Sequence, residues 1–153
     1  MTQDSDRIYA ELHAATSGFG GAKLFTVTVL DRAARLSRRS YTSHPAEYPV
    51  SGTKPMTDDG WSRQVIGEQQ TFVANHTAEF ARFFGDHALI NSLGCQSAVN
   101  IPVIDGGQVV ATVNLLDVEN HFTPDRVAGL KALVASRTPD ILAAIRMAPP
   151  LTA

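Results

Sequence analysis

The sequence predicts a single α+β domain: a central antiparallel sheet with terminal helices on one face and irregular, helix-bearing loops on the other. Two observations lead to this prediction. Pairs of segments rich in β-branched and aromatic residues are joined by turn residues, which is typical of antiparallel hairpins. Amphipathic segments with helical spacing lie at both ends of the chain. A length of 153 residues has room for one hydrophobic core of this kind.

The first third of the chain predicts one helix and one hairpin. Asp4 or Ser5 can cap a helix whose apolar residues recur at helical spacing until a glycine-rich stretch at 18–21 ends it. Residues 23–30 (KLFTVTVL) and 35–43 then have the composition of two strands joined by a short turn. The sheet therefore begins immediately after the first helix.

The middle of the chain predicts a long loop followed by short elements. Residues 44–56 carry three prolines and one glycine without periodicity, so we expect an ordered surface loop there. Thr57 is a good N-cap for a second helix that includes Trp61. A short strand at 71–74 and a helix capped by Thr77 are expected next.

The last third contains the clearest local signals. Residues 96–104 and 108–116 are β-rich runs on either side of Asp-Gly-Gly, which predicts a hairpin. Thr123 and Pro124 form an N-cap followed by a first-turn proline, so a long helix should begin there. Pro139 either kinks this helix or restarts it.

The stretch LGCQSAVNIPVIDGGQVVATVNLLDVE at 93–119, followed by HFTPDRVAGLKALV, resembles the C-terminal part of a GAF domain. The resemblance extends over about 6–147. It implies a GAF-like, PAS-like antiparallel sheet of five or six strands, in which the sheet and its covering loops enclose a small ligand. It also implies a homodimer formed through the N- and C-terminal helices. We expect one domain over 1–153, with a short disordered tail at 148–153.

Two asparagines occupy strands that are otherwise apolar. Asn100 and Asn114 must find hydrogen-bond partners if these strands are buried. By analogy with related GAF enzymes, Ala98 and Asn114 should face the ligand pocket, and the two-residue period of a strand then places Asn100 there too. Their carboxamides would suit an uncharged or zwitterionic ligand. Alternatively, each asparagine binds the backbone of a neighbouring loop. The sequence identifies no charged anchor.

Aromatic residues cluster in the segments that would cover this pocket. They could line a ligand cavity, or they could form a small satellite core under the long loop. Under the first interpretation, the candidate ligand-binding residues are Asn100, Asn114, Trp61, Tyr48, Tyr41, Phe84, Cys95 and Ala98.

The free methionine-R-sulfoxide reductases are GAF proteins of similar length, but their chemistry is not expected here. Those enzymes need a second thiol to resolve a sulfenic acid, and this chain contains only Cys95. Alignment on the strand proline places their catalytic cysteine near Asn91. Their substrate-binding acids fall on Ala98, Asn114 and Leu116. No catalytic set is therefore predicted.

Cys95 keeps two interpretations open. It could be a small buried hydrophobic residue that lines the pocket. It could instead be a reactive thiol in a small enzyme, paired with a histidine such as His87 or His121. The five histidines show no metal-binding spacing, and the glycines at 18–21 precede a strand rather than a helix, so neither a metal nor a phosphate-binding cofactor is expected.

Charge and composition exclude several partners. A net charge of -2 gives no electrostatic basis for binding nucleic acid or an anionic membrane, and a cluster of arginines at 32–39 is expected to protect an exposed edge strand. No apolar run is long enough to span a membrane, and the acidic start does not match a signal peptide. A single cysteine fits the reducing cytoplasm.

These observations favour a GAF-like sensory or regulatory module that binds a small polar metabolite as a homodimer. A thiol-dependent enzyme and a ligand-free interaction module are the alternatives.

Overall fold

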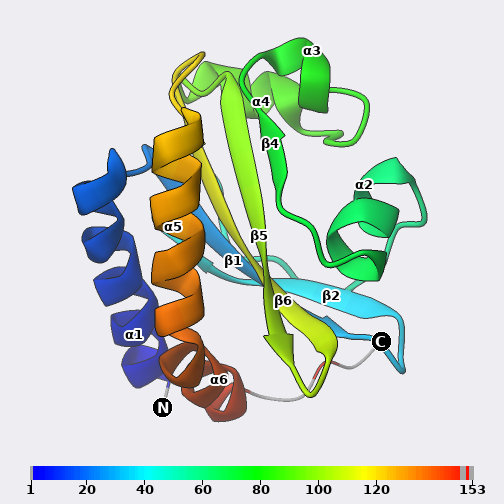
Figure 1. Cartoon of the computed structure of the whole chain (residues 1–153). Coiled ribbons are helices and arrows are strands. Elements are labelled where there is room, and N and C mark those ends of the chain that lie inside the picture. Colours follow the sequence, from blue (N-terminus) through cyan, green and yellow to red (C-terminus); the bar gives the residue numbers. More distant parts are fainter. Residues whose placement is uncertain (1, 149–150, 152–153) are drawn as a thin grey trace.

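A computed structural model describes residues 2–148 and 151, and its centre is one antiparallel sheet (Figure 1). The strands are β1 (Leu24–Asp31), β2 (Leu36–Thr42), β3 (Lys54–Pro55), β4 (Phe72–Ala74), β5 (Ser97–Asp105) and β6 (Gln108–Asp117). They form a six-stranded sheet in the order β3-β2-β1-β6-β5-β4. This arrangement confirms the predicted α+β fold and both predicted hairpins. The predicted tail at 148–153 lies largely outside the described residues.

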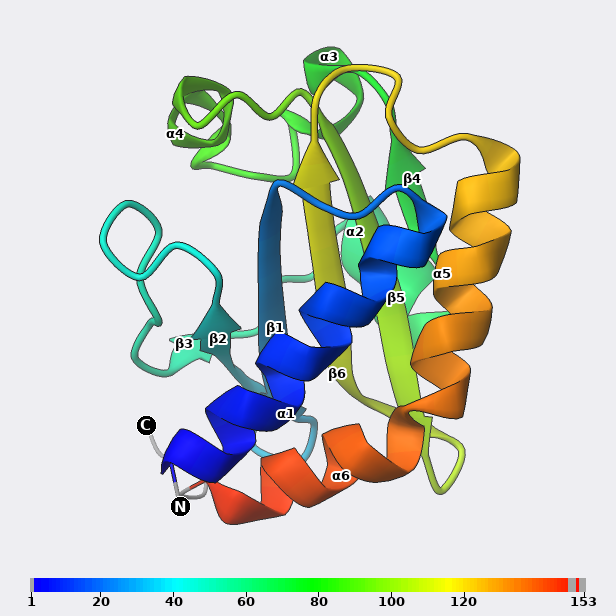
Figure 2. The same ribbon diagram turned by 90° about the vertical axis from the view of Figure 1, so that its left-hand side faces the viewer.

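The helices divide between the two faces of the sheet. They are α1 (Thr2–Ala15), α2 (Gly60–Ser62), α3 (Thr77–Phe80), α4 (His87–Ser92), α5 (Pro124–Ser136) and α6 (Thr138–Met147), with a 3₁₀ turn at Thr16–Phe19 and a π turn at Arg63–Gly67. The helices α1, α5 and α6 cover one face, and α2, α3 and α4 lie on the other side (Figures 1 and 2). Pro139 restarts the helix: α6 begins at Thr138 and carries the proline in its first turn.

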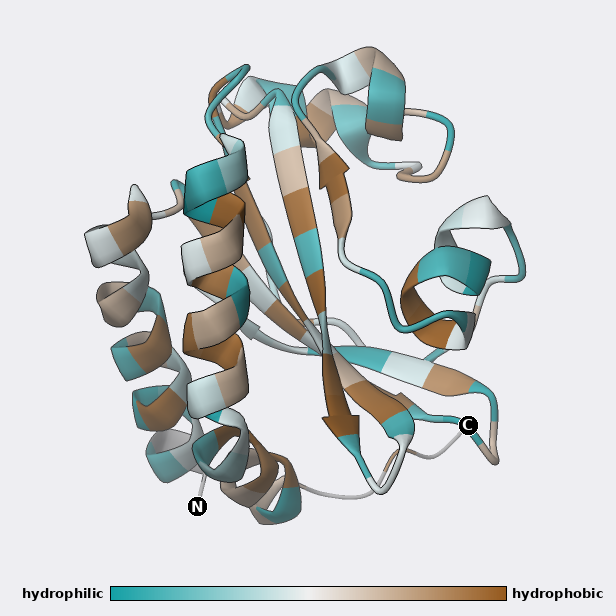
Figure 3. Ribbon diagram, in the orientation of Figure 1, coloured by the Kyte–Doolittle hydropathy of each residue, from teal (hydrophilic) through white to brown (hydrophobic). Residues whose placement is uncertain are grey.

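Each face of the sheet has its own hydrophobic core, because alternate side chains of a strand point to opposite faces. The helix-side core contains the inward residues of α1, α5 and α6, such as Leu12, Leu130 and Ile141. The loop-side core contains Val65, Phe80 and residues from the other side of the same strands. Figure 3 shows hydrophobic residues interrupted by polar ones along the central strands.

The large apolar side chains of the terminal helices are buried inside the protomer. Tyr9, Leu12, Leu130, Val134 and Ile141 are all at most 3% exposed. In the described parts of α1, α5 and α6, the exposed large apolar side chain is that of Met147. The apolar stripes seen in the sequence are therefore covered by the sheet and by the other helices.

Two predictions are corrected in the segment from Tyr48 to Trp61, which lies over the loop side of the sheet and is called the covering segment below. Asp59, rather than Thr57, caps α2: its carboxylate accepts from the Ser62 amide and its own amide donates to the Ser62 hydroxyl, both at 2.9 Å. The long loop also contains β3, in which Lys54 pairs with Ser37 of β2. A two-residue strand has no periodicity of its own, so only pairing with a distant segment reveals it.

Candidate ligand-binding pocket

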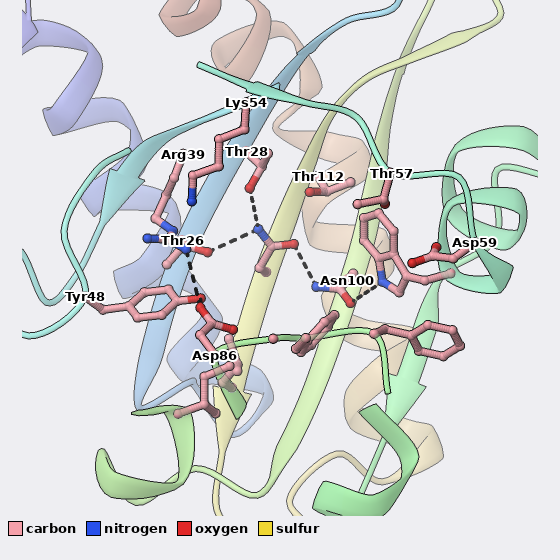
Figure 4. Close-up of a pocket in the computed structure, with 17 residues that line it drawn as sticks. Thr26, Thr28, Arg39, Tyr48, Lys54, Thr57, Asp59, Asp86, Asn100 and Thr112 are labelled. Carbon is pink, nitrogen blue, oxygen red and sulfur yellow. Dashed lines mark hydrogen bonds and ion pairs between the residues drawn. The ribbon is translucent and has the colours of Figure 1, made fainter. Parts of the chain in front are cut away.

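A pocket of about 420 Å³ lies on the loop side of the sheet (Figure 4). Its volume is within the range of small-molecule sites, roughly 300–1,000 Å³. Strands β1, β6 and β5 form its floor, and the chain from β3 to α2 and the segment before α4 form its walls. The lining residues are Thr26, Thr28, Arg39, Tyr48, Lys54, Thr57, Asp59, Trp61, Phe83, Phe84, Gly85, Asp86, Ile90, Asn100, Thr112, Asn114 and Leu116.

The floor is a row of polar side chains in three neighbouring strands. Thr26, Asn114 and Asn100 lie directly opposite one another in the sheet register, so their side chains share one face. Asn100 Nδ2 donates to Asn114 Oδ1 at 2.8 Å. Asn114 Nδ2 in turn donates to the hydroxyls of Thr26 and Thr28, at 3.1 and 3.2 Å.

Trp61 fixes the direction of this network. Its indole Nε1 lies 2.9 Å from Asn100 Oδ1 and is a donor only, so the oxygen of Asn100 must face Trp61. The Asn100 amide nitrogen then faces Asn114, which must present its own oxygen. Both hydrogens of Asn114 Nδ2 are consequently directed at threonine hydroxyls. The whole chain of side chains therefore has one consistent orientation.

One wall is built from an arginine, a tyrosine and an aspartate. The guanidinium carbon of Arg39 lies 3.8 Å from the centre of the Tyr48 ring, and the Tyr48 hydroxyl donates to Asp86. Arg39 also forms a 3.7 Å ion pair with Asp86 and donates to the Pro49 carbonyl at 2.7 Å. Burial and the hydrogen bond to Asp86 raise the pKa of Tyr48 above its usual value, so this hydroxyl stays protonated.

Charged and apolar groups complete the lining. The Lys54 side chain reaches into the pocket on the side of Arg39, whereas Asp59 lies on the side of Thr57 (Figure 4). Apolar surface comes from Phe83, Phe84, Ile90 and Leu116. The pocket therefore combines a polar floor with an apolar wall, and its charges are distributed between two ends.

A family model for the GAF domain matches residues 2–136, which is most of the chain. The chain belongs to the GAF domain family. No curated protein sequence matches it. GAF domains also occur in sensor histidine kinases, chemotaxis proteins and photoreceptors, where they are sensory or regulatory modules.

Solved structures of other GAF domains share the fold across nearly the whole chain. A GAF domain/HD domain protein from Geobacter sulfurreducens has a TM-score of 0.72 at 11% identity, covering 94% of this chain and 95% of that one. The GAF domain of a two-component sensor histidine kinase from Bacillus halodurans gives 0.72 at 14% identity, with coverages of 93% and 96%. A type II free methionine-R-sulfoxide reductase from Thermoplasma acidophilum gives 0.62 at 12% identity, with coverages of 92% and 96%. At these identities the likeness shows the fold alone.

In this GAF domain, five of the eight candidate residues come together around the pocket. They are Asn100, Asn114, Trp61, Tyr48 and Phe84. The two asparagines share one face, as the resemblance and the strand period together predicted, but their partners are side chains rather than loop backbone. Whether these residues bind a ligand stays a prediction.

Tyr41 lies on the opposite side of the sheet. Its ring centre is 5.5 Å from that of Tyr9 and 6.0 Å from that of Phe25, within the helix-side core. The cause is a β-bulge: Tyr41 pairs with Val27 and Arg39 pairs with Thr28, so the alternation of β2 breaks between them. The bulge turns Tyr41 toward the helices and Arg39 toward the pocket.

Cys95 and Ala98 also lie outside the pocket lining. Both side chains are fully buried in the loop-side core. Burial, together with the nearby Asp117, raises the pKa of the Cys95 thiol to about 11, whereas reactive cysteines have a lowered pKa and partial exposure. His121, one proposed partner, lies 2.9 Å from the Gly21 carbonyl oxygen and 3.5 Å from the carboxylate of Asp117. The structure thus offers no support for a thiol-dependent enzyme.

Patterns in the sequence did not indicate the charged residues of the pocket. Arg39 was assigned to an exposed, charge-protected edge strand, but β3 covers part of β2 and the Arg39 side chain is only 19% exposed. The other three charged residues lie in irregular or short segments, where the periodicity of the sequence does not show in which direction a side chain points. They are Lys54, Asp59 and Asp86. Their positions depend on how the covering segment folds back over the sheet.

Two further observations bear on cofactors and membranes. Among residues 2–148 and 151, no group of three or more histidine, cysteine or acidic side chains is placed to hold a metal ion. In the same described residues, no helix combines the length and the apolar character that a membrane span requires.

Proposed function

We propose that this GAF domain is a sensory or regulatory module that binds a small polar metabolite in the pocket on the loop side of the sheet. The observation that carries the proposal is the polar floor. Asn100 is 4% exposed and Asn114 8% exposed, in strands whose neighbouring residues are apolar. Burying carboxamides in a sheet is costly unless their hydrogen bonds are satisfied. Polar side chains on the floor can form directional hydrogen bonds with a ligand. A surface that served only to pack against the covering segment would not need them.

The covering segment supplies the regulatory element of the proposal. Residues from Tyr48 to Trp61 contribute side chains to the pocket but are attached to the sheet mainly through β3 and Arg39. A ligand that contacts this segment and the floor together stabilises one arrangement of the segment over others. The change in the segment would transmit the signal to another protein, in the cytoplasm as the composition predicts.

Native mass spectrometry of freshly purified protein, compared with the denatured mass, tests the proposal. We expect additional mass that disappears on denaturation and that identifies the ligand class. Trp61 provides a second assay because it is the single tryptophan of the chain and lines the pocket. A ligand that binds at the floor must change its fluorescence. A protein that carries no additional mass, and whose Trp61 fluorescence no polar metabolite changes, would refute the proposal.

We also propose that two copies pair through α1 and the C-terminal helices. Since the large apolar residues of these helices are buried within the protomer, the contact would use small and polar side chains. The dimer should therefore dissociate on dilution. Light scattering coupled to size-exclusion chromatography over a range of concentrations tests this expectation, and a monomer at every concentration would refute it.

A further inference from the structure

Lys54 places a positive charge without a partner in the pocket. Within the described part of the chain, no hydrogen bond or ion pair engages its ammonium group, although the other charged lining groups have partners. Figure 4 shows the side chain running from β3 into the pocket on the same side as Arg39. A cation without a partner in a partly enclosed pocket attracts an anionic group.

The charge at this end matches a single negative charge on a ligand. Arg39 is already paired with Asp86, so these two groups largely neutralise each other. Lys54 therefore leaves about one uncompensated positive charge. At the opposite end, Asp59 accepts from the Ser62 amide and would repel an anion. The charges thus orient a monoanion with its charged group toward Lys54.

The hydrogen-bonding capacity of the floor also favours an acceptor. Thr26 and Thr28 each accept a hydrogen from Asn114, which leaves their own hydroxyl hydrogens for another acceptor. Asn100 Nδ2 uses one hydrogen on Asn114 and keeps a second. These unused hydrogens can be satisfied by a carboxylate oxygen, whereas an ammonium group only donates and would leave them without an acceptor.

We infer that the ligand of this pocket is a small organic carboxylate with an apolar body, held by Lys54 and by the hydroxyls of Thr26 and Thr28. Phe83, Phe84 and Leu116 provide the apolar surface for the body. This inference rests on the proposed function of the same pocket and adds the chemical class of its ligand. Lys54 belongs to the two-residue strand β3, so binding of the carboxylate also ties the covering segment to the floor.

Three matched six-carbon probes test the inference: hexanoate, hexanamide and hexylamine. Isothermal titration calorimetry gives their affinities, and Trp61 fluorescence reports whether they occupy the pocket. We expect hexanoate to bind at least about tenfold more tightly than hexanamide, and hexylamine not to bind. Because the contact is charged and partly exposed, the hexanoate affinity should fall as salt is raised from 20 to 500 mM.

Lys54→Met should lower the hexanoate affinity about tenfold and leave hexanamide unaffected. Lys54→Arg should retain most of the affinity, because it keeps the charge. Lys131→Met is the matched control: Lys131 is an exposed lysine on α5, on the helix side of the sheet, and its loss should leave hexanoate binding unchanged. Lys54 is also exposed, so the variants should fold normally.

Failure of this inference can be distinguished from failure of the proposed function. If hexanamide or hexylamine binds as tightly as hexanoate, or if Lys54→Met binds hexanoate normally, the carboxylate assignment is wrong but the pocket still binds small molecules. A co-purified ligand without an acidic group would have the same meaning. If no probe binds and no additional mass co-purifies, both proposals fail.

Discussion

Asn114→Asp separates the role of the floor in binding from its role in folding. An ionised aspartate has nearly the shape of asparagine but only accepts hydrogen bonds. Asn114 already accepts from Asn100, and it donates to Thr26 and Thr28. A hydroxyl can rotate and donate instead, so both threonine bonds survive with their direction reversed. We therefore expect the free energy of unfolding to change by less than about 1.5 kcal/mol.

The same substitution should abolish carboxylate binding. The hydroxyl hydrogens of Thr26 and Thr28 would be taken by the new carboxylate, and the ligand would meet a negative charge on the floor. Two like charges about 4 Å apart repel by about 4 kcal/mol at an effective dielectric constant of ~20. Even half of this energy corresponds to a roughly 30-fold loss of affinity. Hexanoate titration by calorimetry measures the loss.

Asn91→Asp is the matched control for this prediction. Asn91 Nδ2 donates to the Thr77 hydroxyl at 3.0 Å and to the Cys95 carbonyl at 2.8 Å, outside the pocket lining. A carbonyl cannot become a donor, so the new carboxylate would face an acceptor at hydrogen-bond distance. We expect a loss of about 2–3 kcal/mol in urea unfolding, with hexanoate affinity unchanged. The reasoning is refuted if Asn114→Asp retains hexanoate affinity, or if it destabilises as much as Asn91→Asp.

Three further predictions concern single groups. Trp61→Phe removes the donor to Asn100, so urea unfolding should show a loss of about 1 kcal/mol, and a change below about 0.3 kcal/mol would mean that this bond contributes little. Tyr48→Phe removes the hydroxyl that donates to Asp86, so the backbone amide of residue 48, which donates to the His44 carbonyl, should exchange about tenfold faster than in the native protein. Unchanged exchange would contradict a role of the hydroxyl in holding the loop. Burial raises the pKa of Cys95 from 9.0 to about 11, so iodoacetamide at pH 8 should modify only the unfolded protein, and rapid modification of the native protein would contradict the burial. In the folded protein the Cys95 thiol stays protonated at pH values where it ionises in the unfolded chain. The free energy of unfolding is therefore unaffected by this group below about pH 9 and falls between pH 9 and 11. Cys95→Ala should flatten this part of the stability profile.

The elements that the sequence predicted well are those with strong local signals. The hairpin of β5 and β6 follows from two β-rich runs around Asp-Gly-Gly, and α5 begins at the predicted Thr123 cap. The covering segment was predicted less well because its structure depends on distant partners. The strand β3 exists through pairing with β2. The cap of α2, by contrast, is set locally, because Asp59 is a stronger N-cap than Thr57 and forms a capping box with Ser62.

The pocket shows the same division between local and tertiary information. The resemblance to GAF enzymes predicted that Asn114 faces the pocket, and strand periodicity added Asn100. The two residues do share one face, because two-residue alternation holds in this part of β5 and β6. The same rule puts Arg39 and Tyr41 on a common face and fails, because a bulge between them changes the facing of β2. No residue in that stretch marks the bulge in the sequence.

The sequence by itself determined the fold class, the two hairpins and the two asparagines of the floor, through local propensity, strand periodicity and the resemblance to a GAF domain. Thr26 and Thr28 joined the floor only in the structure. The tertiary structure decided which charges meet in the pocket. Arg39, Lys54, Asp59 and Asp86 come from separate segments, and only the packing of the covering segment over the sheet brings them together. Electrostatic complementarity is a property of positions in space, so the charge that selects a ligand could not be read from the order of residues along the chain.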